Sequence, residues 1–386
     1  MKLLFDLVTI QPAWDAKYHG GGIYGEVVFF ALAKHLCKFE MICIYDSKKY
    51  LGEDILSKCS ELKIKLYDIN MHKPKEIVSM ENVDVFYTPR QQWERDWLLN
   101  TKRFVVTWHD FFSLELIYDR IIWNYVKSLK EFINAFARFA YPRFFFNRNR
   151  NRYKMMLERG VEFITDSNHS KASFLSFFPE SKDKRISVLY PPMSRRIIND
   201  NFILPSGITE KKYFLLNSGS RWYKNNLRAI LAFDALFSDM ENSDFKVLLT
   251  GVTNSSVYEK KITNKNHFVF LDFVEPTMLE FLYAKAYAFV YPSLNEGFGY
   301  PPLEAMHYGV PVAASGTSSI PEICQNAAVY FDPYNVNEIK NRIIQLLDKD
   351  IYTEYSARAV ERYKIVSKRQ EQDLEKIVSF ILGERL

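Results

Sequence analysis

Two glutamates flank a glycine-rich turn in the stretch NEGFGYPPLEAMHYGVPV, residues 295–312. Glu296 and Glu304 stand eight positions apart, with Gly297 and Gly299 between them. An ionised carboxylate offers two acceptor oxygens that suit the hydroxyls of a diol, and glycine lets the backbone approach a ligand closely. The stretch therefore indicates either a ligand site or an ordinary strand-to-helix connection with a surface glutamate at each end.

The turn lies between a predicted strand and a predicted helix. The strand is AFVYPS, residues 288–293, and the helix begins near Pro301 or Pro302. Proline suits the first helical turn because its missing N–H would be unpaired there anyway. A helix N-terminus favours anions, so a nucleotide diphosphate is a natural ligand for this turn.

Two basic residues occupy a second junction, in LLNSGSRWYKNN, residues 215–226. Arg221 and Lys224 follow a predicted strand and precede a predicted helix near Asn225. Cations at a helix start oppose the helix dipole, which favours a functional role over two solvated charges. A departing diphosphate needs such positive charge.

The first half carries two weaker signals. HGGGIYGE places Gly20, Gly21 and Gly22 between the first predicted strand and the first predicted helix, and VVTWHDFF places His109 and Asp110 after another strand. Taken alone, the glycine pattern is about as typical of a plain turn as of a ligand-binding loop, and a lone histidine at a strand end is more often structural than functional.

The elements that must position these residues alternate between strands and helices, which predicts an α/β protein with parallel sheets. A helix is expected from about Ile23 to Leu36, and the last 35 or so residues are mainly helical. The predicted strands are KLLFDLV, MICIYD, IKLYDI, VDVFYT, RFVVTW, VEFITD and RISVLY in the first half, and YFLLNS, FKVLLTG, HFVFLD, AFVYPS, VPVAAS and AVYFDP in the second.

The pattern divides the chain into two Rossmann-like halves that we expect to face a cleft. We predict an N-terminal domain at residues 1–190, a linker at 191–212 rich in Pro, Ser and Asn, a C-terminal domain at 213–365, and a final helix at 366–386 packing back on the N-terminal domain.

Composition limits the class of protein. The 386 residues are 48% hydrophobic and 25% charged, with net charge +5, as in a soluble globular protein. The first residues read as a strand and not a signal peptide, no apolar run is long enough to span a membrane, and the four cysteines have neither metal-ligand nor disulfide-framework spacing. A cytoplasmic location is expected.

With these motifs in place, the stretch from Glu296 to Ile323 resembles the signature of the family 4 retaining glycosyltransferases, two-domain enzymes of the GT-B fold. The similarity includes the two glutamates, the Gly-Phe-Gly between them, a Pro-Glu pair at Pro321 and Glu322, and an Asp-Pro pair at Asp332 and Pro333. It covers most of residues 213–335 closely and the first half only loosely.

The resemblance implies roles for individual residues. Glu304 would accept hydrogen bonds from the nucleotide ribose, Glu296 would lie beside the donor sugar, Arg221 and Lys224 would bind the phosphates, and His109 would reach the donor sugar. Because the spacing before Lys224 is shorter than in many family members, Arg221 is the better match of the two. The remaining donor-binding candidates are Gly297, Phe298, Gly299, Tyr300, Leu303, Asn225, Gly21 and Gly22.

The resemblance also implies metal-independent transfer by front-face displacement, with no side chain required as base and no cofactor besides the donor. The sequence GFGYPPLEAM is similar to that of bacterial enzymes of lipopolysaccharide O-antigen or capsule synthesis, often mannosyl- or rhamnosyltransferases. GDP-mannose is the first expectation for the donor and a UDP-sugar the second, with a glycan or lipid-linked acceptor. A phosphorylase, a sugar-nucleotide epimerase and a non-enzymatic nucleic-acid module are the alternatives.

One segment is strongly biased. Residues 132–157 contain no acid, six basic residues and eight aromatic residues. This composition suits either peripheral contact with an anionic membrane, at the inner face of the plasma membrane, or a helix with aromatics in the core and arginines in water. The candidates for the membrane surface are Arg143, Arg148, Arg150, Arg152 and Lys154.

Overall fold

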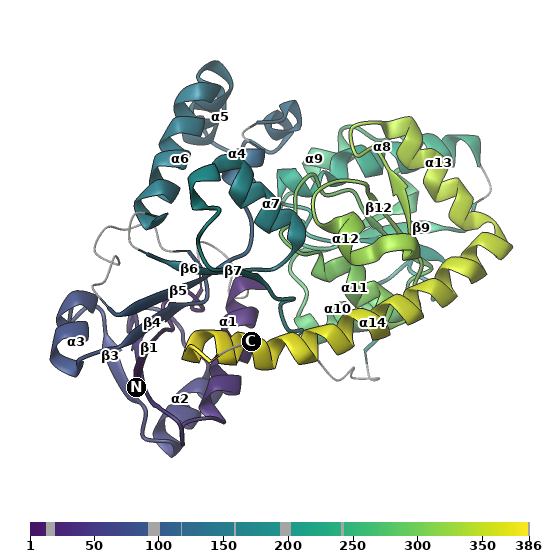
Figure 1. Ribbon diagram of the computed structural model, residues 1–386. Coiled ribbons are helices and arrows are strands. Elements are labelled where there is room, and N and C mark those ends of the chain that lie inside the picture. The colour runs from purple at the N-terminus through teal and green to yellow at the C-terminus, as the bar shows by residue number, and fades with distance from the viewer. Residues whose placement is uncertain are drawn as a thin grey trace. The chain divides into compact units, whose positions relative to one another are not determined.

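The computed structural model describes residues 1–12, 20–91, 101–116, 118–157, 160–193, 202–240 and 243–384. The chain forms two compact units. The first contains residues 1–111, 147–194 and 367–386, and the second contains residues 112–146 and 195–366 (Figure 1). Residues 112–146 thus group with the second unit, although the sequence placed them inside an N-terminal domain at 1–190.

The first unit is built on a parallel sheet whose described strands have the order β3-β2-β1-β4-β5-β6-β7. The strands are β1 (Lys2–Asp6), β2 (Glu40–Tyr45), β3 (Lys65–Asp68), β4 (Val85–Thr88), β5 (Arg103–Trp108), β6 (Glu162–Thr165) and β7 (Ile186–Val188). The helices include α1 (Gly20–Ala33), α2 (Glu53–Glu61), α3 (Pro74–Glu81) and α7 (Asn168–Phe177). Continuous apolar runs such as the fully buried Leu3–Phe5 suit strands that are covered on both faces.

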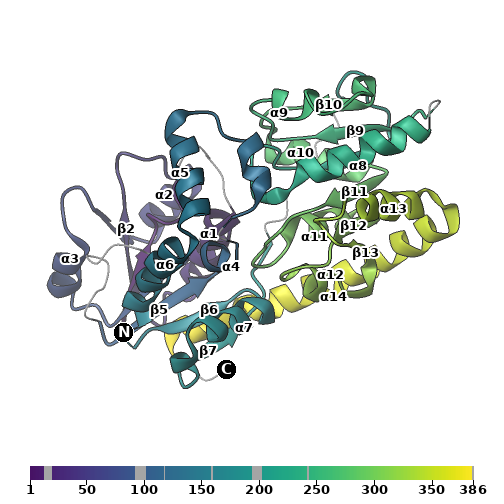
Figure 2. The same cartoon turned by 90° about the horizontal axis from the view of Figure 1, so that it is seen from above.

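The second unit repeats this plan with the strand order β10-β9-β8-β11-β12-β13. The strands are β8 (Tyr213–Leu216), β9 (Lys246–Leu249), β10 (Phe268–Phe270), β11 (Ala288–Tyr291), β12 (Val312–Ser315) and β13 (Ala328–Phe331). The helices include α4 (Phe112–Glu115), α5 (Leu129–Ala140), α8 (Asn226–Asp239), α9 (Ser256–Glu259), α10 (Pro276–Lys285), α11 (Tyr300–His307), α12 (Ile320–Cys324) and α13 (Val336–Leu347). Helices α8 and α13 pack together, as Figures 1 and 2 show, while α10, α11 and α12 contribute to a separate apolar core.

Three segments differ from expectation in their details. Helix α1 begins at Gly20, so the glycines expected in a loop form its first turn. The aromatic and basic segment is two helices, α5 and α6 (Pro142–Leu157), because Pro142 cannot continue the helix before it. The predicted linker falls partly on residues 194–201, which lie outside the described residues.

The final helix, α14, is one continuous element from Lys349 to Leu382. Its residues up to Val366 belong to the second unit and those from Ser367 to the first. In the first unit Asp373 accepts the backbone N–H of Tyr190 at 2.9 Å, and Arg103 donates to the carbonyl oxygens of Phe380 and Ile381, each at 2.9 Å. None of the described helices is both long enough and apolar enough to cross a bilayer.

Candidate active site

The second unit places two loops side by side at its topological switch point. Strand β8 leads by β9 to β10 in one direction and neighbours β11 in the other, so the loops after β8 and β11 leave the same sheet edge and diverge. Crevices at this position bind ligands in open α/β sheets. Residues 217–225 and 292–299 form these two loops and contain most of the predicted site residues.

A buried ion pair joins the two loops. The Lys224 Nζ atom lies 2.6 Å from Oε1 of Glu296, and their side chains are 8% and 14% exposed. Seventy-two positions separate these residues in the sequence. The fold thus brings together two predicted site residues from different motifs.

Two hydroxyls complete the surroundings of the Glu296 carboxylate. Tyr291 donates to Oε1 at 2.7 Å and Ser293 donates to the same atom at 2.5 Å. Lys224 also donates to the Tyr291 hydroxyl at 2.7 Å. Burial raises the pKa of Tyr291 well above its ordinary value, and the charge of Glu296 adds to the effect, so this phenol stays protonated as a donor. Sequence reasoning missed both residues, because nothing in AFVYPS marks their side chains as polar partners of a later glutamate.

The backbone of Glu296 is held as firmly as its side chain. Its N–H donates to Oγ of Ser318 at 3.0 Å, and Ser319 donates to its carbonyl oxygen at 2.9 Å. Within the described ranges all three side-chain donors meet Oε1, and none meets Oε2. This arrangement fixes the carboxylate and keeps one oxygen available to accept a hydrogen bond from a ligand.

Glu304 has a similar partner one turn inside α11. Burial raises the pKa of Tyr283 well above its ordinary value, and the adjacent Glu304 carboxylate, which shares a hydrogen bond with that phenol, raises it further. The Tyr283 hydroxyl also accepts from Nδ2 of Asn217 at 2.8 Å. Because Asn217 occupies the phenol as a donor, the phenol proton is directed to Glu304. Each glutamate of the motif is therefore oriented by a buried tyrosine.

The turn between the glutamates is shaped by one glycine. Gly299 has φ +119° and immediately precedes α11, a conformation that residues with a side chain rarely adopt. Phe298 and Leu303 are buried, while Gly297 and Tyr300 are partly exposed. Pro301 and Pro302 supply no N–H to a ligand at the start of the helix.

Asn225 connects the loop after β8 with the loops after β11 and β13. It is fully buried with φ +59°, and its Nδ2 donates to the carbonyl oxygens of Pro292 at 3.0 Å and Pro333 at 2.7 Å. Its Oδ1 accepts from Arg228 at 2.7 Å. Asn225 therefore positions the loop after β11, and its role in donor binding stays a prediction.

Arg221 differs from Lys224 in its surroundings. It precedes the short 3-10 helix Trp222–Lys224 and is exposed, while Lys224 is 7% exposed. The spacing favoured Arg221 as the better match, yet Lys224 is the one that contacts Glu296. The exposed guanidinium remains able to move toward an anion.

His109 lies in the first unit, at the end of β5. Its Nδ1 is 2.6 Å from Oδ2 of Asp166, and its Nε2 is 2.9 Å from the carbonyl oxygen of Pro89. Burial lowers the pKa of His109, but the charge of Asp166 and its hydrogen bond outweigh burial, and the net pKa is raised. Both nitrogens face acceptors, which favours the protonated imidazolium, and both of these acceptors belong to the first unit.

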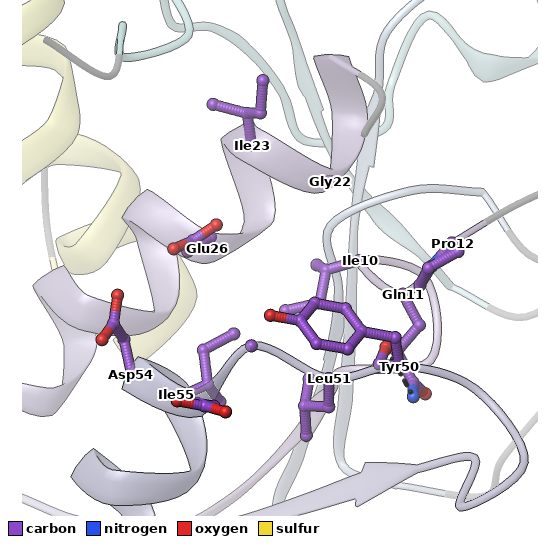
Figure 3. Close-up of a pocket in the computed structure, with 12 residues that line it drawn as sticks. Ile10, Gln11, Pro12, Gly22, Ile23, Glu26, Tyr50, Leu51, Asp54 and Ile55 are labelled. Carbon is purple, nitrogen blue, oxygen red and sulfur yellow. Dashed lines mark hydrogen bonds between the residues drawn. The ribbon is translucent and has the colours of Figure 1, made fainter. Parts of the chain in front are cut away.

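A cavity of about 310 Å³ lies in the first unit between α1 and the segment that follows β2 (Figure 3). Gly22, in the first turn of α1, lines it, whereas Gly21 is not among its lining residues. Figure 3 shows Glu26 from α1 and Asp54 from α2 on one side and the ring of Tyr50 on the other. Among the described residues, the lining includes three carboxylates and no basic side chain, so this part of the cavity suits neutral hydroxyl groups better than an anion.

The five basic candidates of the predicted membrane surface all lie on α6. Arg143, Arg148, Arg152 and Lys154 are exposed. Arg150 is only partly exposed: its Nε donates to the carbonyl oxygen of Phe177 at 3.3 Å, and its guanidinium lies 5.7 Å from the Phe178 ring. In the part of the chain that the structure describes, no group of three or more His, Cys, Asp or Glu side chains is arranged to hold a metal ion.

Comparison with known proteins adds to this geometry. Residues 199–365 match the family model described as glycosyl transferases group 1. The O-antigen chain mannosyltransferase RfbU of Salmonella typhimurium is 31% identical over 201 residues, which are 50% of this chain and 54% of that protein. The chain thus matches about half the length of this curated relative.

Two solved structures share the fold along nearly the whole chain. A glycosyltransferase from Rickettsia africae has a TM-score of 0.63 at 17% identity and covers 100% of this chain and 99% of its own. Anabaena Alr3699/HepE, solved in complex with UDP and glucose, has a TM-score of 0.60 at 15% identity and covers 98% and 100%. The predicted GT-B fold with two parallel-sheet, Rossmann-like domains is confirmed.

Proposed function

We propose that this chain, which resembles the group 1 glycosyltransferases in residues 199–365 and has the GT-B fold, moves a hexose from a nucleotide diphosphate sugar to a glycan or lipid-linked acceptor in cell-surface polysaccharide synthesis. The similarity to an O-antigen mannosyltransferase supports mannose or a similar sugar, and lipopolysaccharide O-antigen or capsule as the product. Because half of that relative is unmatched, the reaction of this chain needs its own test.

The observation that carries the proposal is the ion pair of Lys224 and Glu296 at the switch point of the second unit. A diphosphate bound at the start of α11 would be attracted to the Lys224 ammonium, and the second oxygen of Glu296 would accept from a donor-sugar hydroxyl. Glu304 would accept from the ribose diol. Positive charge aimed at the departing phosphate stabilises the charge that develops as the bond to the sugar breaks.

We infer a retaining transfer without a metal ion. The bond from the anomeric carbon to the phosphate oxygen breaks while the acceptor oxygen adds to the same face of the sugar. The acceptor proton passes to the departing phosphate, so the charges balance without a base from the protein. Lys224, Arg221 and the amides of the turn would supply the positive field.

GDP-mannose is the proposed donor and a UDP-sugar the second candidate. The name of the Salmonella relative favours a mannosyl donor, and the Anabaena structure, which holds UDP, favours uridine. The motifs in this chain would contact the phosphates and the ribose, which all such donors share, so they do not choose between the two bases.

The acceptor is assigned to the first unit. The cavity beside α1 offers the Tyr50 ring for stacking on a sugar face and Glu26, Glu53 and Asp54 as acceptors for hydroxyls. We further propose that the protein works in the cytoplasm at the inner face of the plasma membrane, where a lipid-linked acceptor is presented, and touches the anionic membrane surface peripherally.

A thermal-shift screen with GDP, UDP, ADP and dTDP tests the nucleotide, because a ligand that binds the folded state raises the apparent melting temperature. Transfer assays with the matching sugar nucleotide then test the reaction. We expect GDP to give the largest shift and turnover to require an acceptor sugar. Turnover supported by inorganic phosphate would indicate a phosphorylase, and conversion of the sugar nucleotide alone would indicate an epimerase.

A further inference from the structure

Helix α5 of the second unit exposes a continuous apolar face. Leu129, Phe132, Ile133, Phe136 and Phe139 are between 48% and 74% exposed. Their spacing of three and four residues places them on one stripe of the helix. We call these five residues the α5 apolar face.

The exposure is concentrated and not scattered. Tyr141 and Phe144, which follow α5 directly, are 65% and 62% exposed. Seven of the 19 exposed large hydrophobic side chains in the described part of the chain therefore fall between residues 129 and 144. Single exposed hydrophobic residues need no explanation, but a contiguous patch marks an interaction surface.

The fold supports this helix with few contacts. Within α5, all of whose residues are described, Ala135 is the one buried side chain. The ring centroids of Phe139 and Tyr118 are 4.9 Å apart, and those of Phe132 and Trp123 are 5.4 Å apart. An isolated helix of this length is marginal in water, and most helices are stabilised by packing an apolar face. Ring contacts at two of its five residues therefore cover the α5 apolar face only lightly.

Basic residues are concentrated near the face, along the sequence and at the start of α5. Lys127, Lys260 and Lys261 line a cavity of about 450 Å³ beside the start of α5. Residues 126–157 contain eight basic residues and one acid, Glu131, whose carboxylate accepts the backbone N–H of Lys127 at 2.7 Å. An apolar helix face bordered by lysine and arginine is the composition that binds the headgroup region of an anionic bilayer.

The same charge argues against a second copy of the chain as the partner. A two-fold contact would bring each patch against an identical patch. Residues 126–157 carry eight basic residues and one acid, Glu131, so two such patches brought together would repel each other. Anionic lipid, in contrast, complements the charge and buries the apolar residues together.

We propose that α5 is an interfacial membrane helix whose apolar face enters the boundary between lipid headgroups and acyl chains, with the neighbouring lysines and arginines at the level of the lipid phosphates. This inference rests on the proposed peripheral membrane contact and deepens it. It moves the main attachment from the arginines of α6 to the α5 apolar face, and it makes the attachment partly hydrophobic. Hydrophobic burial is not screened by salt, whereas contacts between exposed charges are.

Vesicle sedimentation with the full chain tests the proposal. One set of vesicles is phosphatidylcholine alone, and the other is about three parts phosphatidylcholine to one part phosphatidylglycerol. Three variants are compared with the wild type, at about 0.05 M and 0.5 M NaCl. They are the apolar-face variant Phe132→Ser/Ile133→Ser/Phe136→Ser, the charge variant Arg148→Ser/Arg150→Ser/Arg152→Ser, and the control Met71→Ser/Met80→Ser, which removes exposed hydrophobic residues elsewhere.

We expect the wild type to bind the anionic vesicles and to retain part of that binding at high salt. The apolar-face variant should bind at least about tenfold more weakly at both salt concentrations, because its loss is hydrophobic. The charge variant should weaken mainly at low salt, and the control should bind as the wild type does. Circular dichroism and nucleotide calorimetry on each variant check that folding and the donor site are intact.

Three results would overturn the inference. Wild-type binding by the apolar-face variant would remove α5 from the contact, and the peripheral contact would survive only if the charge variant lost binding. Failure of the wild type to bind any vesicle would contradict both the α5 attachment and the peripheral membrane contact. A wild type that sediments as a dimer, binds no vesicle and becomes monomeric in the apolar-face variant would identify a second copy as the partner. Nucleotide affinity is read separately, so none of these results decides the proposed glycosyl transfer.

Discussion

At the scale of single residues, the site is organised by pairs that the linear sequence does not show. The sequence identified Glu296, Glu304 and Lys224 from local motifs at strand-to-helix junctions, where a cation is notable because it opposes the helix dipole. The partners Tyr291 and Tyr283 lie in an apolar strand and an apolar helix, where tyrosine is an ordinary core residue. Their hydroxyls become functional only when the sheet brings them beside the two glutamates.

The two glutamates should fail in different ways. Glu304→Gln should weaken binding of the free nucleotide diphosphate, because the ribose contact does not require the sugar. Glu296→Gln should bind the free nucleotide nearly as the wild type does and lose mainly kcat with the full donor, since its contact to the sugar strengthens in the transition state. Calorimetry with the nucleotide and steady-state kinetics with the donor measure both effects. Equal losses of nucleotide affinity would show that the roles are misassigned.

The two basic residues provide a second contrast. Arg221→Ala should slow transfer by raising its activation free energy by about 2–4 kcal/mol. The urea midpoint of unfolding should not change, because the Arg221 side chain is exposed. Lys224→Met should lower transfer and also destabilise the fold by about 3–5 kcal/mol, because it leaves the buried Glu296 carboxylate without its cation. Wild-type turnover in Arg221→Ala would remove that residue from the site.

His109 predicts a pH dependence of stability. Its pKa is raised above the ordinary value of 6.5, so its protonated form stabilises the folded state, fully below about pH 6.5 and progressively less as the pH rises through the raised pKa. The unfolding free energy of the wild type minus that of His109→Gln, measured in urea from about pH 5.5 to 9, should therefore be largest at the acidic end. A difference that does not change with pH would mean that the ring does not titrate in this way.

At the scale of elements, the alternation of strands and helices was predicted well and the junctions less well. Each described strand of both sheets overlaps a predicted strand, and the central strands are apolar because they are buried on two faces. Helix α1 begins earlier than expected, since the first helical turn tolerates the low helix propensity of Gly20, Gly21 and Gly22. The break at Pro142 was readable from the proline, but the exposure of α5 was not, because an amphipathic pattern does not say what its apolar face contacts.

The turn before α11 predicts an effect on stability. Gly299→Ala should destabilise the second unit by about 1–2 kcal/mol, because the residue has φ +119° and a side chain is strained there. No atom lies within 4 Å of the added Cβ, so the cost would come from the backbone and not from a clash. Gly20→Ala, also without a neighbour within 4 Å but with no positive φ, is the matched control. Similar urea midpoints for the two variants would contradict this account.

At the scale of the whole molecule, each unit has its own sheet and its own apolar core. The first core includes Leu3, Phe5 and Phe29, and the second includes Phe214, Phe233 and Val290. The sequence anticipated this duplication because the strand pattern restarts after the linker. It could not anticipate that residues 112–146 group with the second unit, since no composition boundary marks Phe112.

Two separate cores predict that a nucleotide stabilises the units unequally. Binding to the second unit lowers the population of its unfolded form, and at about 100 times the dissociation constant the gain is about 2.7 kcal/mol, or about a hundredfold slower exchange of its most protected amides. Hydrogen exchange with the best nucleotide from the thermal screen should therefore slow most in β8 and β11, and much less in β1 and β2. If amide exchange slowed equally in β1, the two units would unfold together. If exchange slowed only in β1 and β2, the nucleotide would bind the first unit and not the second. The same experiment on Glu304→Gln, at the same nucleotide concentration, should show less slowing in β8 and β11, which ties the protection to the ribose contact and not to a nonspecific effect of the nucleotide.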